Sequence, residues 1–263
     1  MVLYDLMSVS ITFDIEQDLH SEGYKSISLG LPKVIEILDE HNIKSTLFIP
    51  ARLIAKFPTY FKKLDKQGHE IAIHGYEHER FNLLSFSEKD RRIKESINIY
   101  RRIFHKNPTG FRAPQHSIDR ETLILLEKYK FLYDSSYTPF NFLQVFSFPG
   151  RVISWLREFF KPRKKYQIYG NLYEIPLSSF FISFSSLLLR VFPWSIIKIY
   201  LNLLKLTNKD IVFYLHSWDL IKIPQSRIDR KFSYKRILSN FEKLIIYLEK
   251  REIFLKMEEV AKK

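Results

Sequence analysis

Short β-rich segments alternate with helical segments along most of the chain, and this alternation restricts the fold more than any other feature of the sequence. The strand-like runs lie at residues 8–13, 44–49, 70–73, 110–112, 131–133, 210–215 and 252–255. Apolar residues recur at helical spacing between several of these runs. We expect helices at residues 31–38, 60–66, 87–104, 119–129 and 234–248. Repeated strand–helix units predict an α/β fold in which helices cover a parallel sheet.

The composition indicates one globular domain spanning residues 1–263, since 46% of the residues are hydrophobic and 27% are charged. The segment at about 140–205 interrupts the alternation. It is dense in aromatic and basic residues, including the run Lys161-Pro-Arg-Lys-Lys165. We expect this segment to form a cap or insertion, either a helical cap with an apolar underside or a segment that contacts a membrane interface.

The chain carries a net charge of +13. This surplus favours a polyanionic partner such as anionic lipid or an acidic glycan, unless it reflects only a solvated, lysine-rich surface. No nucleic-acid-binding motif is recognisable, so no nucleic acid is expected. The N-terminus lacks the basic start and apolar core of a signal peptide, and no apolar run approaches the roughly 20 residues of a membrane span. These features favour a cytoplasmic protein, either free or peripheral at the membrane.

Candidate metal ligands follow two of the predicted strands. His74 and His78 lie four residues apart after the strand at 70–73, in a chain with only eight histidines. Asp14 and Glu16 follow the strand at 8–13, and their spacing directs both side chains to the same side of an extended chain. Because the chain has no cysteine, a metal site must use histidine and carboxylate. Two histidines and a carboxylate form a ligand set for zinc or a similar divalent ion, with a coordination position left for water.

Five short motifs occur in an order that resembles the polysaccharide deacetylase family, also known as the NodB-homology domain or carbohydrate esterase family four. They are Thr12-Phe-Asp-Ile-Glu16, His74-Gly-Tyr-Glu-His78, Gly110-Phe-Arg-Ala-Pro114, Tyr133-Asp-Ser-Ser136 and Tyr214-Leu-His-Ser-Trp218. The resemblance runs from about residue 8 to residue 220. It implies a distorted, TIM-like (β/α) barrel of seven to eight parallel strands with the aromatic and basic segment as an insertion.

The resemblance also implies a metal-binding role for His74 and His78. The family's familiar form has two adjacent aspartates, of which the second binds the metal, but Ile15 stands in that place here. One branch of the family spaces its acids by one residue, and Asp14 and Glu16 resemble that branch. Glu16 is therefore the expected third ligand, and Asp18 is the alternative.

Four further residues receive catalytic roles from the resemblance. Asp14 would act as the general base, and Arg112 would hold it ionised and oriented. His216 would act as the general acid that protonates the leaving amine. Asp134 would hydrogen-bond to His216 and tune it.

Three residues are candidates for substrate binding, namely Tyr76, Pro114 and Trp218, although a packing role is the alternative for Tyr76 and Trp218. His116 lies near a motif and could contact the substrate. The three histidines that stand outside the motifs are expected at the surface, and they are His41, His69 and His105.

The sequence therefore predicts a metal-dependent hydrolase of linear amide bonds that removes an N-acetyl group from an amino sugar in a polysaccharide or glycan precursor. The cofactor would be one divalent ion, zinc first, with cobalt, nickel or manganese as alternatives. The segment Tyr173-Glu-Ile-Pro-Leu-Ser178 looks like the branch linked to exopolysaccharide and envelope glycan synthesis. An N-acetylated glycan or glycolipid is thus the expected substrate, and peripheral membrane contact is expected. Three alternatives remain open: a hydrolase of another amide, such as a formamido sugar or ureide; an inactive carbohydrate-binding protein; and a basic scaffold that binds membranes or polyanions.

Overall fold

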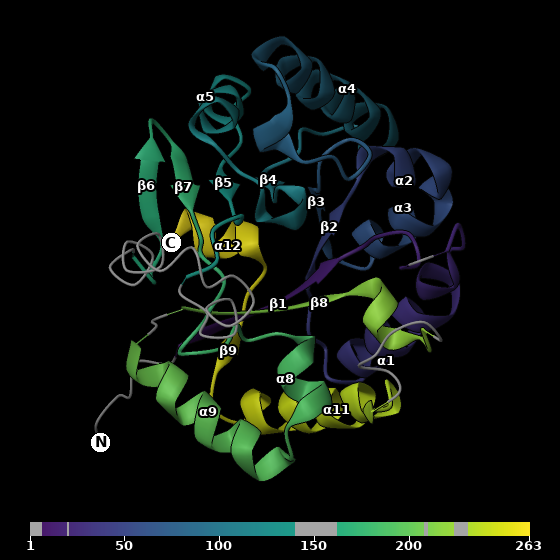
Figure 1. Ribbon diagram of the computed structural model, residues 1–263, viewed down its shortest axis with the longest axis vertical. Coiled ribbons are helices and arrows are strands. Elements are labelled where there is room, and N and C mark those ends of the chain that lie inside the picture. Colours follow the sequence, from purple (N-terminus) through teal and green to yellow (C-terminus); the bar gives the residue numbers. More distant parts are fainter. Residues whose placement is uncertain (1–6, 20, 140–161, 208–209, 224–230) are drawn as a thin grey trace.

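The computed structural model describes residues 7–19, 21–139, 162–207, 210–223 and 231–263 (Figure 1). Within these residues, nine strands form one sheet. The strands are β1 (Ser8–Asp14), β2 (Thr46–Ile49), β3 (Glu70–Ile73), β4 (Gly110–Phe111), β5 (Tyr133–Asp134), β6 (Tyr166–Tyr169), β7 (Leu172–Glu174), β8 (Asp210–His216) and β9 (Ile253–Phe254). The helices are α1 (Leu31–Glu40), α2 (Ala51–Lys56), α3 (Pro58–Lys66), α4 (Phe86–Phe104), α5 (Arg120–Lys128), α8 (Ser186–Val191), α9 (Trp194–Thr207), α11 (Lys235–Glu249) and α12 (Met257–Lys262). Short helical turns lie at Ser26–Gly30, Phe81–Leu83, Pro114–His116 and Ser217–Leu220.

The sheet has the strand order β6-β7-β5-β4-β3-β2-β1-β8, and β9 also pairs with β1. Of the described strands, eight run parallel, and β6 alone pairs antiparallel, with β7. After β7 the chain returns to β8, where the N–H of Ser178 donates to the carbonyl oxygen of Val212 at 3.3 Å. The N–H of Val212 donates to Ser178 Oγ at 2.9 Å. The sheet therefore curves toward closure with helices around it (Figure 1), and the predicted α/β barrel of parallel strands is confirmed.

All seven predicted strands are present, but two more are not foreseen by the sequence. Strands β6 and β7 lie within the segment for which a cap or insertion is predicted, and β7 pairs in parallel with β5. At least this part of the segment belongs to the sheet, and residues 140–161 lie outside the described residues. The extent of a cap thus stays a prediction.

The buried core fixes the relative position of β1 and β8. All seven residues of β1 are buried. The rings of Phe13 and Phe213 meet Phe241 of α11, with centroids 6.4 and 6.0 Å away. The strand register pairs Asp14 directly with His216. Two of the residues with predicted catalytic roles are therefore neighbours at the carboxyl ends of adjacent strands.

The surface position predicted for His69 is wrong. Its side chain is buried, and its Nδ1 lies 3.2 Å from the backbone N of Ser45 and 2.9 Å from Ser45 Oγ. Burial lowers the pKa of His69 to about 4, with a further contribution from Lys44. His69 is thus a neutral core histidine at the start of β3, where helix α3 covers the sheet.

Candidate active site

The carboxyl ends of the parallel strands bring the candidate residues together at one end of the barrel. Asp14 ends β1, His74 directly follows β3, Arg112 follows β4 and His216 ends β8. In a parallel barrel, side chains at this end converge from several strands, so residues distant in sequence become neighbours. His74 is joined to β2 through its N–H, which donates to the carbonyl oxygen of Ile49 at 3.0 Å.

His74 has the geometry of a metal ligand. Its side chain is buried, and its Nδ1 lies 2.9 Å from the carbonyl oxygen of Arg112. Because a carbonyl only accepts, Nδ1 carries the proton and Nε2 carries the lone pair. This Nε2 has no hydrogen-bond partner and lies 3.4 Å from Oε1 of Glu16. A buried ring nitrogen without a partner destabilises a fold unless a ligand satisfies it.

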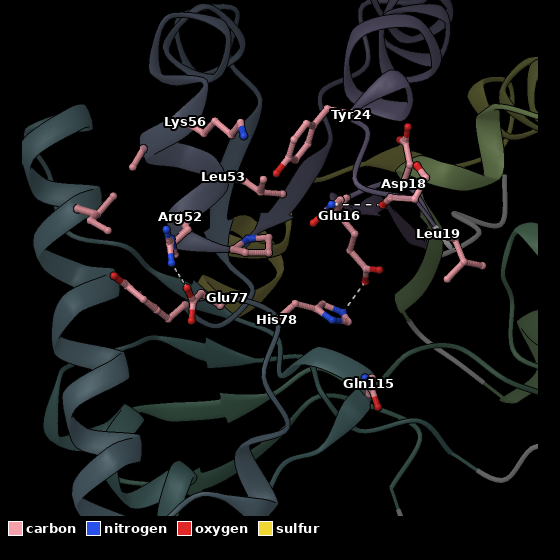
Figure 2. A pocket seen from close by; sticks show the side chains of 16 residues that line it. Glu16, Asp18, Leu19, Tyr24, Arg52, Leu53, Lys56, Glu77, His78 and Gln115 are labelled. Carbon is pink, nitrogen blue, oxygen red and sulfur yellow. Dashed lines mark hydrogen bonds and ion pairs between the residues drawn. The ribbon is translucent and has the colours of Figure 1, made fainter. Parts of the chain in front are cut away.

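His78 and Glu16 complete a three-residue cluster. Nε2 of His78 lies 2.9 Å from Oε1 of Glu16, and Figure 2 shows this ring turned toward the carboxylate. One ligand atom from each of Glu16, His74 and His78 lies within 4.8 Å of the others. His78 reaches this place with a φ of 75°, a left-handed conformation that is strained for histidine and is typical of functional sites.

Glu16, rather than Asp18, faces the histidines. The two Oδ atoms of Asp18 each accept a backbone N–H, from Lys25 and Ser26, both at 2.8 Å. Asp18 is thus committed to the loop that precedes the helical turn Ser26–Gly30. Ile15 is fully buried in the core, as the alternation along an extended chain predicts. The structure therefore favours Glu16 as the carboxylate of the cluster.

The electrostatics of the cluster suit a cation. Burial alone would raise the pKa of Glu16, but the imidazoles of His74 and His78 hold it well below the usual range. The second oxygen, Oε2, accepts the indole N–H of Trp218 at 3.0 Å. The N–H of Glu16 donates to Ser217 Oγ at 3.0 Å. An ionised, oriented carboxylate beside two imidazoles is the donor set expected around a divalent ion.

Asp14 and Arg112 form a buried ion pair, as the resemblance implied. Nη1 of Arg112 donates to Oδ1 of Asp14 at 2.6 Å, and both side chains are almost completely buried. Burial would raise the pKa of Asp14, but Arg112 and then His74 lower it below its usual value. The guanidinium is fixed in turn by Thr12 Oγ1 at 3.1 Å and by the carbonyl oxygen of Ser135 at 3.0 Å. Asp14 is therefore an ionised carboxylate with a fixed orientation.

Asp219, and not Asp134, holds His216. Nδ1 of His216 lies 3.5 Å from Oδ2 of Asp219, and the same oxygen accepts the N–H of His216 at 3.1 Å. Asp219 is held from α8, by Ser186 Oγ at 2.6 Å and by Nη2 of Arg190, 3.5 Å from Oδ1. Sequence reasoning missed Asp219, although it directly follows the motif that ends at Trp218 and lies three residues from His216.

The surroundings of His216 favour its charged form. Burial would lower the pKa of His216, but Asp219 and then Glu16 raise it to about 9. The ring stacks on Trp218 with centroids 4.3 Å apart and an interplanar angle of 15°. His216 is thus an oriented imidazolium that can release a proton.

The role predicted for Asp134 is therefore wrong. Oδ1 of Asp134 accepts the hydroxyl of Ser136 at 2.6 Å, and the strand register places Asp134 opposite Glu174 of β7. Burial raises the pKa of both carboxyls. Because β7 enters the sheet beside β5, the side chain of Asp134 interacts with Ser136 and Glu174 and not with His216.

A cleft of about 1070 Å³ opens beside Glu16 and His78 (Figure 2). Tyr76 lines this cleft, and Arg92 lies over its ring at 4.9 Å. A role of Tyr76 in substrate binding stays a prediction. Pro114 is buried and lies within 3.0 Å of the place where a Cβ on Gly75 would stand. The further lining includes residues that the sequence did not single out, among them Tyr24, Arg52, Leu53, Lys56 and Gln115.

His116 lies close to the site without joining the metal cluster. Its Nδ1 is 3.2 Å from the carbonyl oxygen of Ser136, and its ring meets that of Tyr214 edge to face at 5.8 Å. Burial lowers the pKa of His116 to about 4, so the ring is neutral. Contact between His116 and the substrate stays a prediction.

Comparison with known proteins shows similarity to one family over about half of the chain. A family model described as polysaccharide deacetylase matches residues 5–133. These residues, about half of the chain, are therefore similar to the polysaccharide deacetylase family. A peptidoglycan deacetylase-like protein of Gibberella zeae is 37% identical over 119 residues, which are 44% of this chain and 35% of that protein. The matched region thus spans about a third of that relative.

Solved structures of deacetylase type share the fold over the whole chain. A protein of Mycobacterium smegmatis assigned to the polysaccharide deacetylases superposes with a TM-score of 0.71 at 18% identity, over 100% of this chain and 91% of that one. An allantoinase superposes with a TM-score of 0.70 at 15% identity, over 99% and 91%. The fold of this chain is therefore shared by a protein described as an allantoinase.

Proposed function

We propose that this protein is a metal-dependent deacetylase that removes the N-acetyl group from an amino sugar of a glycan. One observation carries the proposal. The partnerless Nε2 of buried His74 is aimed at Glu16 and His78, beside an ionised Asp14 held by Arg112 and an imidazolium at His216. Similarity to the deacetylase family over residues 5–133 supports the substrate class.

Glu16, His74 and His78 would hold the ion. Two imidazole nitrogens and one carboxylate oxygen suit zinc first, and cobalt, nickel or manganese also accept such ligands. When bound, a divalent ion polarises an acyl carbonyl and increases the acidity of water.

The other residues of the site handle the protons. Asp14 takes a proton from the attacking water as the new bond forms between water oxygen and carbonyl carbon. Arg112 keeps Asp14 ionised and oriented until that transfer. His216 donates its proton to the amide nitrogen as the carbon–nitrogen bond breaks, because an amide anion is a poor leaving group. Acetate and a free amine leave.

The test is release of acetate from N-acetylglucosamine oligomers by the metal-loaded protein. Asp14→Asn should retain the metal and lose about 10²–10⁴-fold in kcat, because it removes the general base. His74→Ala should lose metal binding together with activity. Unchanged hydrolysis by Asp14→Asn, or a metal-loaded wild-type protein that releases no acetate, would contradict the proposal.

A second candidate is hydrolysis of a ureide or formamido sugar, and the similarity to an allantoinase supports it. The same assay with allantoin and with an N-formyl sugar separates the two. Acetate release with no turnover of these substrates favours the deacetylase. An inactive binding protein is less well supported, because Asp14 pairs with Arg112, Asp219 orients His216, and the three candidate metal ligands lie within reach of one ion.

We further propose that the substrate is a glycan or glycolipid precursor handled in the cytoplasm near the membrane. The similarity of Tyr173-Glu-Ile-Pro-Leu-Ser178 to the exopolysaccharide-linked branch supports this narrower substrate class. Cell fractionation tests the location, and recovery outside the cytoplasmic and membrane fractions would contradict it.

A further inference from the structure

Helix α9 carries a stripe of exposed apolar side chains. Ile196, Ile199, Leu203 and Leu206 recur at spacings of three, four and three residues, which places them on one face of the helix. Their exposed fractions are 42%, 57%, 36% and 80%. The opposite face is buried against the barrel, so α9 is apolar on both sides. An apolar helix face that is left open to solvent marks an interaction surface.

The chain around this stripe is free of negative charge. Residues 175–209 contain no aspartate or glutamate. Within α9, Lys198 is exposed and Lys205 pairs with Glu252 of the neighbouring segment. A surface with this composition attracts anions and does not repel them.

Helix α11 lies alongside α9 (Figure 1), and the positive charge of this surface continues there. Tyr247 of α11 packs edge to face on Trp194 at 5.8 Å, and its hydroxyl lies 3.4 Å from Oδ1 of Asn202. This contact identifies the side of α11 that faces α9.

Cations lie beside this contact. Lys243 stands four residues before Tyr247 and shares its side of α11. Lys250 and Arg251 directly follow the end of the helix, and Arg251 lies over the Tyr247 ring at 4.2 Å. Glu249 points elsewhere, since it binds His41 at the end of α1. An apolar stripe is therefore bordered by positive charge.

We propose that this α9 surface, made by the four apolar residues of the stripe with Lys198, Lys243, Lys250 and Arg251, docks onto an anionic lipid bilayer. Basic residues beside an apolar helix face are typical of helices that lie in the plane of a membrane interface. None of the helices in the described part of the chain is long and apolar enough to cross a bilayer. A second copy of this chain fits less well, because a symmetric contact would bring the same cations face to face.

Co-sedimentation with vesicles tests the proposal. The full chain should bind vesicles of equimolar phosphatidylcholine and phosphatidylglycerol, and bind phosphatidylcholine alone much more weakly. The double variant Ile199→Glu with Leu203→Glu should lower the affinity for the mixed vesicles roughly tenfold or more, because two apolar side chains no longer enter the interface. Lys243→Glu with Arg251→Glu should reduce the dependence on phosphatidylglycerol.

Ile124→Glu is the matched control, since Ile124 is 43% exposed on α5 and lies outside the α9 surface. This variant should bind vesicles like the wild type, and acetate release from soluble oligomers verifies that each variant is folded. Absence of vesicle binding at low salt, or equal binding by the α9 double variant and the control, would overturn the proposal. A dimer that dissociates in the double variant, without vesicle binding by the wild type, would assign the surface to a second copy.

Discussion

Oδ2 of Asp219 lies 3.5 Å from Nδ1 of His216 and accepts its backbone N–H at 3.1 Å, so one carboxylate holds both the ring and the main chain of the proposed general acid. The carboxylate is itself held by Ser186 and Arg190 of α8. Helix α8 thus takes part in the geometry of the site without facing the cleft.

Asp219→Asn should lower kcat about 10–100-fold while KM and metal content change little, because the acid loses its orientation and part of its charge stabilisation. Asp219 raises the pKa of His216, so its removal lowers that pKa. A general acid is inactive once deprotonated, and the alkaline limb of the kcat profile should therefore move to lower pH.

Asp134→Asn is the comparison variant, since Asp134 bonds to Ser136 and lies opposite Glu174. It should leave the alkaline limb of the kcat profile in place. An alkaline limb that moves in Asp134→Asn and stays in Asp219→Asn would return the tuning role to Asp134.

The assignment of Glu16 over Asp18 predicts opposite results for two conservative variants. Glu16→Gln should bind zinc at least about 10–100-fold more weakly in a competition assay with a chelator, because it removes the anionic ligand. Asp18→Asn should keep the zinc stoichiometry and lose about 1 kcal/mol of stability, since one of two accepted backbone hydrogen bonds is weakened. Zinc loss in Asp18→Asn with retention in Glu16→Gln would reverse the assignment.

The buried ion pair predicts that substitutions of Asp14 and of Arg112 have strongly coupled effects on the free energy of unfolding. Arg112→Met should lower the free energy of unfolding by about 3–5 kcal/mol, because it leaves Asp14 buried without its partner charge. Asp14→Asn together with Arg112→Met should recover part of that loss. Urea unfolding of the two single variants and the double variant measures the coupling, and simple additivity would contradict it.

Much of the site could be predicted from the sequence because its residues lie in short motifs at strand ends. The strand period orients Asp14 and Glu16 alike, and parallel pairing then brings the strand ends to one place. The choice of Glu16 over Asp18 needed the structure, since it depends on which carboxylate the loop at Lys25 and Ser26 engages.

The sequence-based predictions fail where contacts between distant parts of the chain determine the partner of a side chain. Asp134 is engaged at β7, a strand of three residues whose sequence gives no strong strand signal. Asp219 is held by Arg190 of α8, a contact between two residues that are 29 positions apart in the sequence. The sequence predicts His69 at the surface because nothing in its local sequence shows that its ring meets Ser45 in the core.

His69 makes a pH-dependent contribution to stability. Its pKa is lowered to about 4 in the folded protein from the ordinary value of 6.5, so between these values the unfolded chain binds the proton that the folded chain excludes. The free energy of unfolding should therefore fall as the pH drops from 6.5 to 4, by roughly 2–3 kcal/mol from this residue. In His69→Gln, the free energy of unfolding should lack this contribution to its pH dependence. Urea unfolding measured at several pH values between 6.5 and 4 tests this. His105→Asn, at an exposed position, is the control and should keep the wild-type slope. A stability difference between wild type and His69→Gln that is equal at pH 7 and pH 4 would show that His69 is protonated as easily in the folded protein as in the unfolded chain.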